Sequence, residues 1–196
     1  MTTSDYVVVD VETSGTDPNT DRVLSIAALT MNPDGTIDRT LHTLLNPGVD
    51  PGPTNIHGLT PAKLAGQPQY PTIAPALAEL LNGRILVAHN VAFDYAFLAA
   101  EARRSGTELP VTTALCTVEL ARNLNLGTGS LSLAALAHHW DITQTKPHDA
   151  LDDARVLAAI LSRALTAAAR RNIALPLRAP HTLTTPVFTP SHRCAA

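Results

Sequence analysis

The first part of the chain alternates between short apolar runs and polar turns. Three segments are predicted to be strands, at residues 6–12, 23–31 and 41–45. They are joined by two turn sequences, Asp17-Pro18-Asn19 and Asn32-Pro33-Asp34-Gly35. The pattern therefore predicts a meander of three strands.

Helical spacing dominates the second part. Thr60 can cap a short helix with Pro61 at its first position, and residues 70–81 have a helical pattern that Asn82-Gly83 ends. An apolar run of strand length then leads directly into another helix, at residues 85–88 and 93–104. Further helices are predicted at 117–123, 130–139 and 149–169. Strands first, then alternation, then helices indicate an α/β fold with a central mixed β-sheet flanked by α-helices.

The last segment has a different character. From Asn172 onward the chain contains four prolines among scattered Thr and Ser residues, which breaks both the strand and the helix periodicity. We therefore expect one domain over residues 1–171 and a Pro-rich, flexible C-terminal tail over residues 172–196.

Composition narrows the class of protein. The 196 residues suit one ordinary domain, and an apolar share of 45% with a charged share of 16% is typical of a globular protein without a membrane span. The first residues lack the pattern of a signal sequence, and the two cysteines form neither a disulfide framework nor a CxxC motif, so we expect a cytoplasmic protein. The net charge of −3 provides no global basic field, so any nucleic acid must be bound locally.

Two acids end the first predicted strand. Asp10 and Glu12 are two residues apart, so both carboxylates project from the same face of the sheet. Two like charges side by side on a buried strand are costly, and a shared Mg²⁺ or Mn²⁺ relieves that cost because these cations prefer carboxylate oxygen. A solvated strand end explains the same pair, and this segment alone leaves both interpretations open.

More candidates lie at predicted helix starts. Asp94 follows the fourth predicted strand and falls in the first turn of a helix, where the helix dipole favours negative charge. His148 precedes the last predicted helix and Asp153 lies one turn inside it, so the two can face one site. Taken alone, Asp94 can be an ordinary first-turn acid. Helix capping is the commoner explanation for the cluster of Asp149, Asp152 and Asp153. We expect replacement of Asp152 to be mild.

Together these segments resemble the DEDDh exonucleases, the family of the proofreading epsilon subunit of bacterial DNA polymerase III and of RNase T. Three motifs of that family, DxETxG, HNxxFDxxFL and HxAxxDA, occur here in family order. They are matched by Asp10, Glu12, Thr13 and Gly15, by His89, Asn90, Phe93, Asp94, Phe97 and Leu98, and by His148, Ala150, Asp153 and Ala154. The likeness extends from about residue 5 to residue 165.

The resemblance implies an RNase H-like fold and 3′→5′ hydrolysis of phosphodiester bonds that releases nucleoside 5′-monophosphates. It implies two divalent cations, Mg²⁺ or Mn²⁺, held by Asp10, Glu12, Asp94 and Asp153, with His148 as general base. The terminal nucleotide would lie beside Thr13, Gly15, His57, Asn90 and Phe93. The expected partner is the 3′ end of single-stranded DNA or a frayed 3′ end, whereas His89, His138 and His139 are left out of the site.

Two alternatives stay open. An RNA-trimming exoribonuclease of the RNase T or oligoribonuclease type has the same fold and metals, and no residue here can be shown to test for a 2′-hydroxyl. A non-catalytic accessory module of a polymerase is the other, and the intact set of four acids and one histidine counts against it. A clamp-binding peptide would need a glutamine after the domain, and the chain beyond Asp153 contains none, so the sequence does not support polymerase or clamp association.

Overall fold

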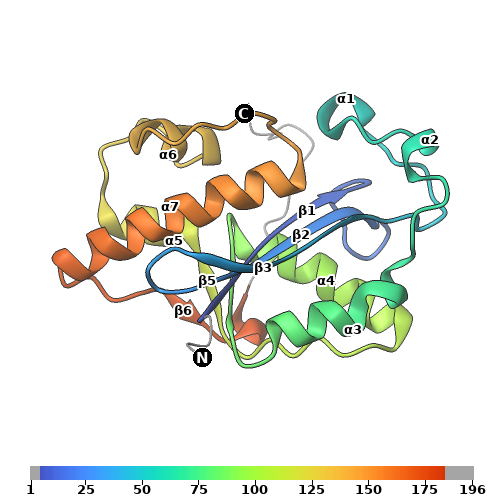
Figure 1. Cartoon of the computed structure of the whole chain (residues 1–196), viewed down its shortest axis with the longest axis horizontal. Helices are drawn as coiled ribbons and strands as arrows, with labels where there is room; N and C mark the ends of the chain where they lie inside the picture. The colour runs from blue at the N-terminus through green and yellow to red at the C-terminus, as the bar shows by residue number, and fades with distance from the viewer. Residues whose placement is uncertain (1–4, 184–196) are drawn as a thin grey trace.

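The computed structural model of the chain describes residues 5–183. Its strands form one mixed sheet in the order β3-β2-β1-β4-β5-β6 (Figure 1). The strand bounds are β1 (Tyr6–Thr13), β2 (Val23–Met31), β3 (Ile37–Leu44), β4 (Ile85–Ala88), β5 (Ala114–Cys116) and β6 (Leu177–Arg178). The first three strands are an antiparallel meander, β1, β4 and β5 run parallel, and β6 returns antiparallel to β5.

Helices cover both faces of this sheet. In Figure 1, α7 crosses one side of the strands, and α3 and α4 lie on the other. The helix bounds are α1 (Thr54–His57), α2 (Pro61–Leu64), α3 (Tyr70–Leu81), α4 (Val91–Ser105), α5 (Thr117–Leu124), α6 (Leu133–His139) and α7 (Ala150–Arg170), with a 3-10 turn η1 (Pro180–Thr182). Within residues 5–183, every helix is too short or too polar to cross a bilayer.

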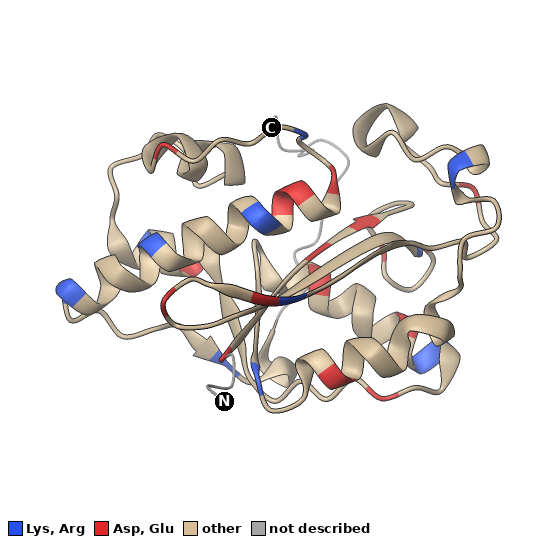
Figure 2. Cartoon of the chain, viewed as in Figure 1, with Lys and Arg blue, Asp and Glu red and all other residues tan. Residues whose placement is uncertain are grey.

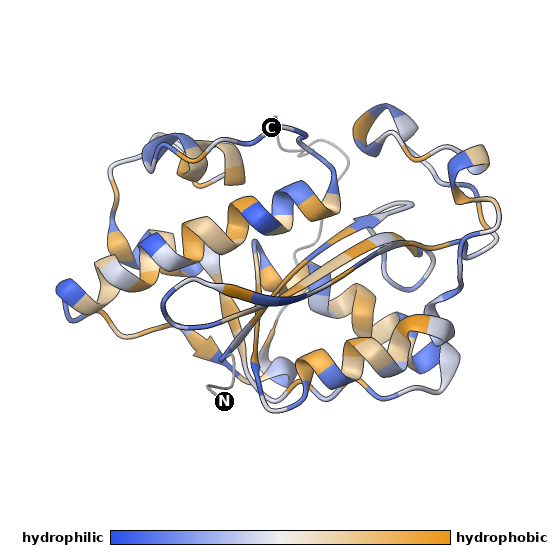
Figure 3. Cartoon of the chain, viewed as in Figure 1, coloured by the Kyte–Doolittle hydropathy of each residue, from blue (hydrophilic) through white to orange (hydrophobic). Residues whose placement is uncertain are grey.

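The side chains of β1 alternate between two cores. Val7, Val9 and Val11 pack with α3 and α4 in one buried cluster, whereas Tyr6 and Val8 pack with α5 and α7 in another. Hydrophobic segments accordingly run along the strands and along the helices that cover them (Figure 3). Because side chains two residues apart share a face, Asp10 and Glu12 continue the row of Tyr6 and Val8. The two acids therefore lie on the face that α7 covers.

Strand β1 extends beyond its parallel neighbour. It pairs with β2 along its whole length, but with β4 only over Tyr6–Val8. The carboxyl end of β1 therefore projects past β4, where the chain turns into α4. Ligand sites of α/β proteins form at such carboxyl ends of parallel strands.

The predicted fold class is confirmed, and most predicted elements recur with the same or similar bounds. The edge strand β3 begins at Ile37 rather than at residue 41, because most of its side chains are exposed and leave no apolar signal. Strand β5 has only three residues, and α1 only four, so neither gives a periodic pattern long enough to recognise.

The start of the C-terminal segment differs from the loose packing that we expected. Residues 177–178 form β6, Ile173 and Leu175 pack against the α5–α7 cluster, and Leu183 packs against the other cluster. Proline excludes helix and central strand, but an edge strand and a 3-10 turn tolerate it. This part of the segment, residues 172–183, is therefore packed on the domain, and residues 184–196 lie outside the described residues.

Candidate active site

Two acids on β1 form the floor of the site. Asp10 and Glu12 stand opposite the small residues Ala27 and Ser25 of β2. Burial raises the pKa of Asp10 well above its usual range, and the charges of Asp94, Glu12 and Asp153 raise it further. Burial, followed by the charges of Asp153 and Asp94, raises the pKa of Glu12 to about 8. Both shifts have burial as their largest cause and the charges of neighbouring carboxylates as a further one.

Asp94 of α4 is a third acid of the site, and its charge acts on Asp10. It lies in the first turn of α4 and is only 4% exposed. Its carboxylate accepts hydrogen bonds from its own backbone N–H and from that of Val11, beyond the segment that β1 pairs with β4. These bonds favour the charged form, but burial outweighs them and raises the pKa of Asp94. Asn90 precedes this helix in a left-handed conformation, with φ of 73°.

The third contribution is the start of α7. Asp149 caps the helix by accepting from Asp152 N at 3.1 Å. Asp153, which is 7% exposed, accepts from His148 N at 3.0 Å through Oδ2 and from Gln144 Nε2 at 2.7 Å through Oδ1. Burial raises the pKa of Asp153 despite these two hydrogen bonds. Its carboxylate is thus held in one orientation by two donors.

His148 has a strained backbone. Its φ of 63° lies in the left-handed region, and Asp149 N donates to Lys146 O at 3.1 Å across it. Residues 146–149 thus form a β-turn, with Pro147 second and His148 third. A turn of this kind ordinarily has Gly or Asn at the third position. Such strain costs roughly 1–3 kcal/mol and persists where the surroundings impose it.

These three segments converge on one cluster. Ligand atoms of Glu12, His148 and Asp153 all lie within 4.8 Å of one another. The charges of Asp94, Glu12 and Asp153 all act on Asp10. Acidic segments of β1 and of the first turn of α7 lie toward the same end of the sheet (Figure 2). A set of carboxylate oxygens with raised pKa values suits a hard divalent cation such as Mg²⁺ or Mn²⁺, which relieves their mutual repulsion.

Metal binding by this cluster should release protons. In the metal-free protein the raised pKa values keep part of the carboxyl groups protonated at pH 7, and ligands must be deprotonated. Mn²⁺ titration by calorimetry in two buffers of different ionisation enthalpy should therefore show net proton release at pH 7 and less at pH 9. Mn²⁺ should also bind more tightly as the pH rises toward 8. Equal heats in both buffers at pH 7 would contradict the raised pKa values.

The same shifts predict how stability depends on pH. The pKa of Glu12 is 4.5 in its ordinary state and about 8 in the folded one, so between these values the folded protein binds more protons than the unfolded one. Stability then falls as the pH rises through this interval. The Tm of the metal-free protein should decline from pH 5 to pH 8, Glu12→Gln should flatten the decline, and Mn²⁺ should offset it at pH 8. A Tm that rises over this interval in the metal-free wild type would contradict the shift.

Thr13 and Gly15 lie in the turn that leaves β1. Thr13 Oγ1 donates to Gly15 O at 2.6 Å. A Cβ at Gly15 would lie 2.2 Å from Asp21 Oδ2, so glycine allows the turn to fold back against Asp21. The turn is also fixed from outside, because Arg22 forms a bidentate ion pair with Glu101 of α4, which is 1% exposed. Both residues are therefore presented by a rigid turn next to the acids.

His57 lies near His148, whose charge contributes to lowering the pKa of His57 after burial. Leu59 N donates to His57 Nδ1 at 3.0 Å, so the proton is on Nε2, which donates to Pro51 O at 3.2 Å. With both ring nitrogens used, His57 shapes the loop between residues 51 and 59. Its imidazole has no nitrogen left for a direct hydrogen bond to a nucleotide.

Phe93 is half-buried and packs against the core around α3 and α4, with its ring centroid 4.9 Å from that of Phe97. This aromatic ring therefore has a packing role, whatever else it contacts. His89 also has a structural position, since its Nδ1 is 3.0 Å from Thr117 Oγ1 at the start of α5. Burial lowers the pKa of His89 to about 4.

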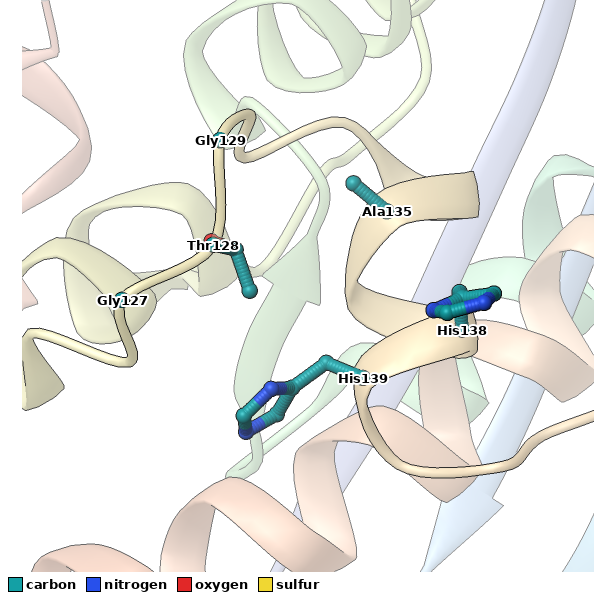
Figure 4. Close-up of a pocket in the computed structure, with 6 residues that line it drawn as sticks. All are labelled: Gly127, Thr128, Gly129, Ala135, His138 and His139. Atoms are coloured by element: carbon teal, nitrogen blue, oxygen red, sulfur yellow. The ribbon is translucent and has the colours of Figure 1, made fainter.

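His138 and His139 lie elsewhere. They come from the end of α6 and line a surface pocket of about 430 Å³ with Thr128, Ala135 and two glycines (Figure 4). The candidate acids are not among the residues that line this pocket. The acid cluster is therefore separate from this pocket, and its carboxylate charges define it.

Sequence reasoning missed three contributors, Gln144, Arg22 and Glu101. Gln144 holds Asp153, and the ion pair holds the turn after β1. The partners of the ion pair are 79 residues apart in the chain. Neither contact leaves a periodic or motif signal in the sequence.

Comparison with known proteins also indicates a nuclease. The model of an exonuclease family, RNase T, matches residues 7–161, which is most of the chain. The chain belongs to this exonuclease family. The predicted resemblance is therefore confirmed at the level of the family, and the enzyme class that it indicates is that of the 3′→5′ exonucleases.

Individual members of the exonuclease family show how far the likeness extends. The 3′-5′ exonuclease DinG of Bacillus subtilis is 30% identical over 158 residues, covering 79% of this chain. The DNA polymerase III subunit epsilon of Aquifex aeolicus is 30% identical over 162 residues, covering 82% of this chain and 80% of that subunit. The structure of exonuclease X in complex with 5′ overhanging duplex DNA matches with a TM-score of 0.66 and 29% identity, over 84% of this chain and 93% of that one.

The relatives differ greatly in length. The chain spans 17% of DinG and between 11% and 26% of two further bacterial relatives. The shared part is the exonuclease domain, so activities that reside in the rest of those longer proteins have no counterpart in the match.

Proposed function

We propose that this chain removes nucleotides from the 3′ end of single-stranded DNA, or from a frayed 3′ end of a duplex, and releases nucleoside 5′-monophosphates. The observation that carries the proposal is the convergence of Asp10, Glu12, Asp94 and Asp153 from β1, α4 and α7, with His148 beside them. Family membership alone gives the reaction class. The intact acid set supports an active member of the family.

The four acids would hold two divalent cations, Mg²⁺ or Mn²⁺. Their donor atoms are all carboxylate oxygens, which Mg²⁺ and Mn²⁺ prefer, and the mutual repulsion of these carboxylates supports the proposal of a bound cation. When bound, such cations supply charge stabilisation for a scissile phosphate and lower the pKa of water.

His148 is proposed as the general base. It lies at the accessible rim of the cluster, with its backbone N–H fixed on Asp153. An imidazole is a common general base, suited to accept a proton from water near neutral pH. The strained turn points to a function for this position, since strain of this kind collects at catalytic residues.

The proposed substrate contacts are those that the family resemblance implies. Thr13 and Gly15 would contact the terminal nucleotide from the turn after β1, and Asn90 from the start of α4. His57 would act indirectly, by shaping the loop opposite His148, and Phe93 through its packing against the helix of Asp94. The net charge of −3 favours a grip on a few terminal nucleotides rather than on a long duplex.

Preference for DNA is supported by the relatives. The epsilon subunit belongs to a DNA polymerase by name, and exonuclease X was observed with overhanging duplex DNA. The alternative substrate is RNA, as for exoribonucleases of the same family, and a non-catalytic role in a polymerase assembly is a further alternative. The sequence does not support association with a polymerase, because the chain beyond Asp153 contains no glutamine for a clamp-binding peptide.

A product assay separates these functions. Matched single-stranded DNA and RNA oligonucleotides, labelled at the 5′ end, are incubated with the protein and Mg²⁺ or Mn²⁺, and products are resolved by mass. The proposal expects a ladder shortened from the 3′ end, nucleoside 5′-monophosphates, and faster hydrolysis of DNA. Faster hydrolysis of RNA would favour the exoribonuclease, and intact substrates with both metals would favour the accessory role.

A further inference from the structure

Residues 144–148, which we call the base loop, wrap over the first turn of α7. Their contacts fall on two adjacent carboxylates. Asp153 accepts from Gln144 Nε2 and from His148 N. Asp152 accepts from Thr145 N at 2.9 Å, from Thr145 Oγ1 at 2.8 Å and from Lys146 N at 2.7 Å.

The contacts of Asp152 fall at the entrance of the turn that carries His148. Lys146 is the first residue of that turn, and its carbonyl accepts from Asp149 N. The φ of 63° at His148 is a backbone conformation that residues other than glycine rarely adopt without support from their surroundings. Something must hold the turn in place, and the two donors at Thr145 N and Lys146 N are bound to a single oxygen, Oδ2 of Asp152.

We propose that Asp152 is a positioning residue for His148. It fixes the base loop on the first turn of α7, so that the strained turn places the imidazole beside Glu12 and Asp153. Without Asp152, the turn relaxes toward a negative φ at His148 and the imidazole leaves the cluster. The sequence pattern assigns Asp152 to surface capping and predicts a mild effect, but its three hydrogen bonds lead to the opposite expectation. This inference rests on the proposed role of His148.

The effect should be confined to the base. Asp153 keeps its own bonds to Gln144 and to His148 N, and Asp152 contributes no ligand atom to the cluster of Glu12, His148 and Asp153. Asp152→Ala should therefore lower kcat by about 10- to 100-fold, the loss expected for a misplaced catalytic group. The KM for a single-stranded DNA oligonucleotide and the Mn²⁺ concentration for half-maximal rate should change by less than about twofold.

Two variants separate positioning from a loss of stability. Asp152→Asn keeps an oxygen for both backbone donors, and its amide can donate to Thr145 Oγ1, so it should retain most of the wild-type kcat. Asp34→Ala is a matched control, because Asp34 accepts from Thr36 N at 2.9 Å and from Thr36 Oγ1 at 2.7 Å in the turn between β2 and β3. It should leave kcat unchanged. Thermal denaturation of all variants shows whether any loss of rate is a loss of folded protein.

A double-mutant cycle with His148→Ala is the decisive test. If Asp152 acts through His148, Asp152→Ala should lower the residual kcat of His148→Ala by less than about twofold. A near-wild-type kcat for Asp152→Ala would overturn the inference, and so would an equal fold-loss in both backgrounds. Full activity of His148→Ala alone would instead refute the proposed base. The two failures are thus distinguishable.

Discussion

Replacing Asp10, Glu12, Asp94 or Asp153 by Ala is expected to leave a folded protein. Its exonuclease rate should fall by a factor on the order of 10³ or more. In the proposed site each carboxylate would supply ligand oxygen to the same cations, and the charge stabilisation lost with them would be worth several kcal/mol, at about 1.4 kcal/mol for each factor of ten. The rate is measured on a single-stranded DNA oligonucleotide at saturating Mn²⁺, with folding checked by circular dichroism.

The Tm of these variants, measured without metal, is a second test of the site. Asp10 is buried among like charges that raise its pKa, so Asp10→Ala should not lower the Tm of the metal-free protein by the amount usual for a buried residue. Mn²⁺ should then stabilise the variant less than the wild type. Asp38→Ala on the exposed edge strand β3 serves as the control, with unchanged rate and unchanged response to Mn²⁺.

One result would overturn the assignment on α7. Near-wild-type hydrolysis by Asp153→Ala would show that the ligand is a neighbouring acid, Asp149 or Asp152. The hydrogen bonds argue against this outcome, because Asp152 is turned toward the base loop and Asp149 caps α7, whereas Asp153 is buried beside Glu12.

His148→Ala is expected to lower turnover by about 10²–10⁴-fold while leaving metal affinity nearly unchanged. The reason is the proposed division of roles, since Mg²⁺ prefers oxygen ligands and the four carboxylates would already supply them. In the wild type the rate at saturating metal should rise with pH on the acidic side of its profile, and this acidic limb should disappear in the variant. Kinetics over pH 5 to pH 9 and Mn²⁺ calorimetry together test the prediction.

The two measurements must separate for the mechanism to hold. Calorimetry that showed Mn²⁺ binding lost in His148→Ala, with the rate restored by excess metal, would make the histidine a ligand. The position of His148 within 4.8 Å of ligand atoms of Glu12 and Asp153 makes this a demanding test. Asp34→Ala is again the control, because its side chain contacts Thr36 in the turn between β2 and β3.

Local rules in the sequence determined much of this protein. Alternation of side chains on a strand puts Asp10 and Glu12 on one face, and helix-start signals put Asp94 and Asp153 in first turns, as the structure shows. Both depend only on neighbours within a few residues, so the chain itself encodes them. The motif order then indicated the family, which the comparisons confirm.

The tertiary structure alone decided which groups meet. No local rule says that the Asp10 face of β1 is the one that α7 covers, that Asp94 accepts from Val11, or that both nitrogens of His57 bind their own loop. The three hydrogen bonds of Asp152 reach back six or seven residues into a loop without periodicity, so its sequence position looked like that of a capping acid. Such contacts depend on the path of the chain between helices, which residue patterns do not specify and packing does.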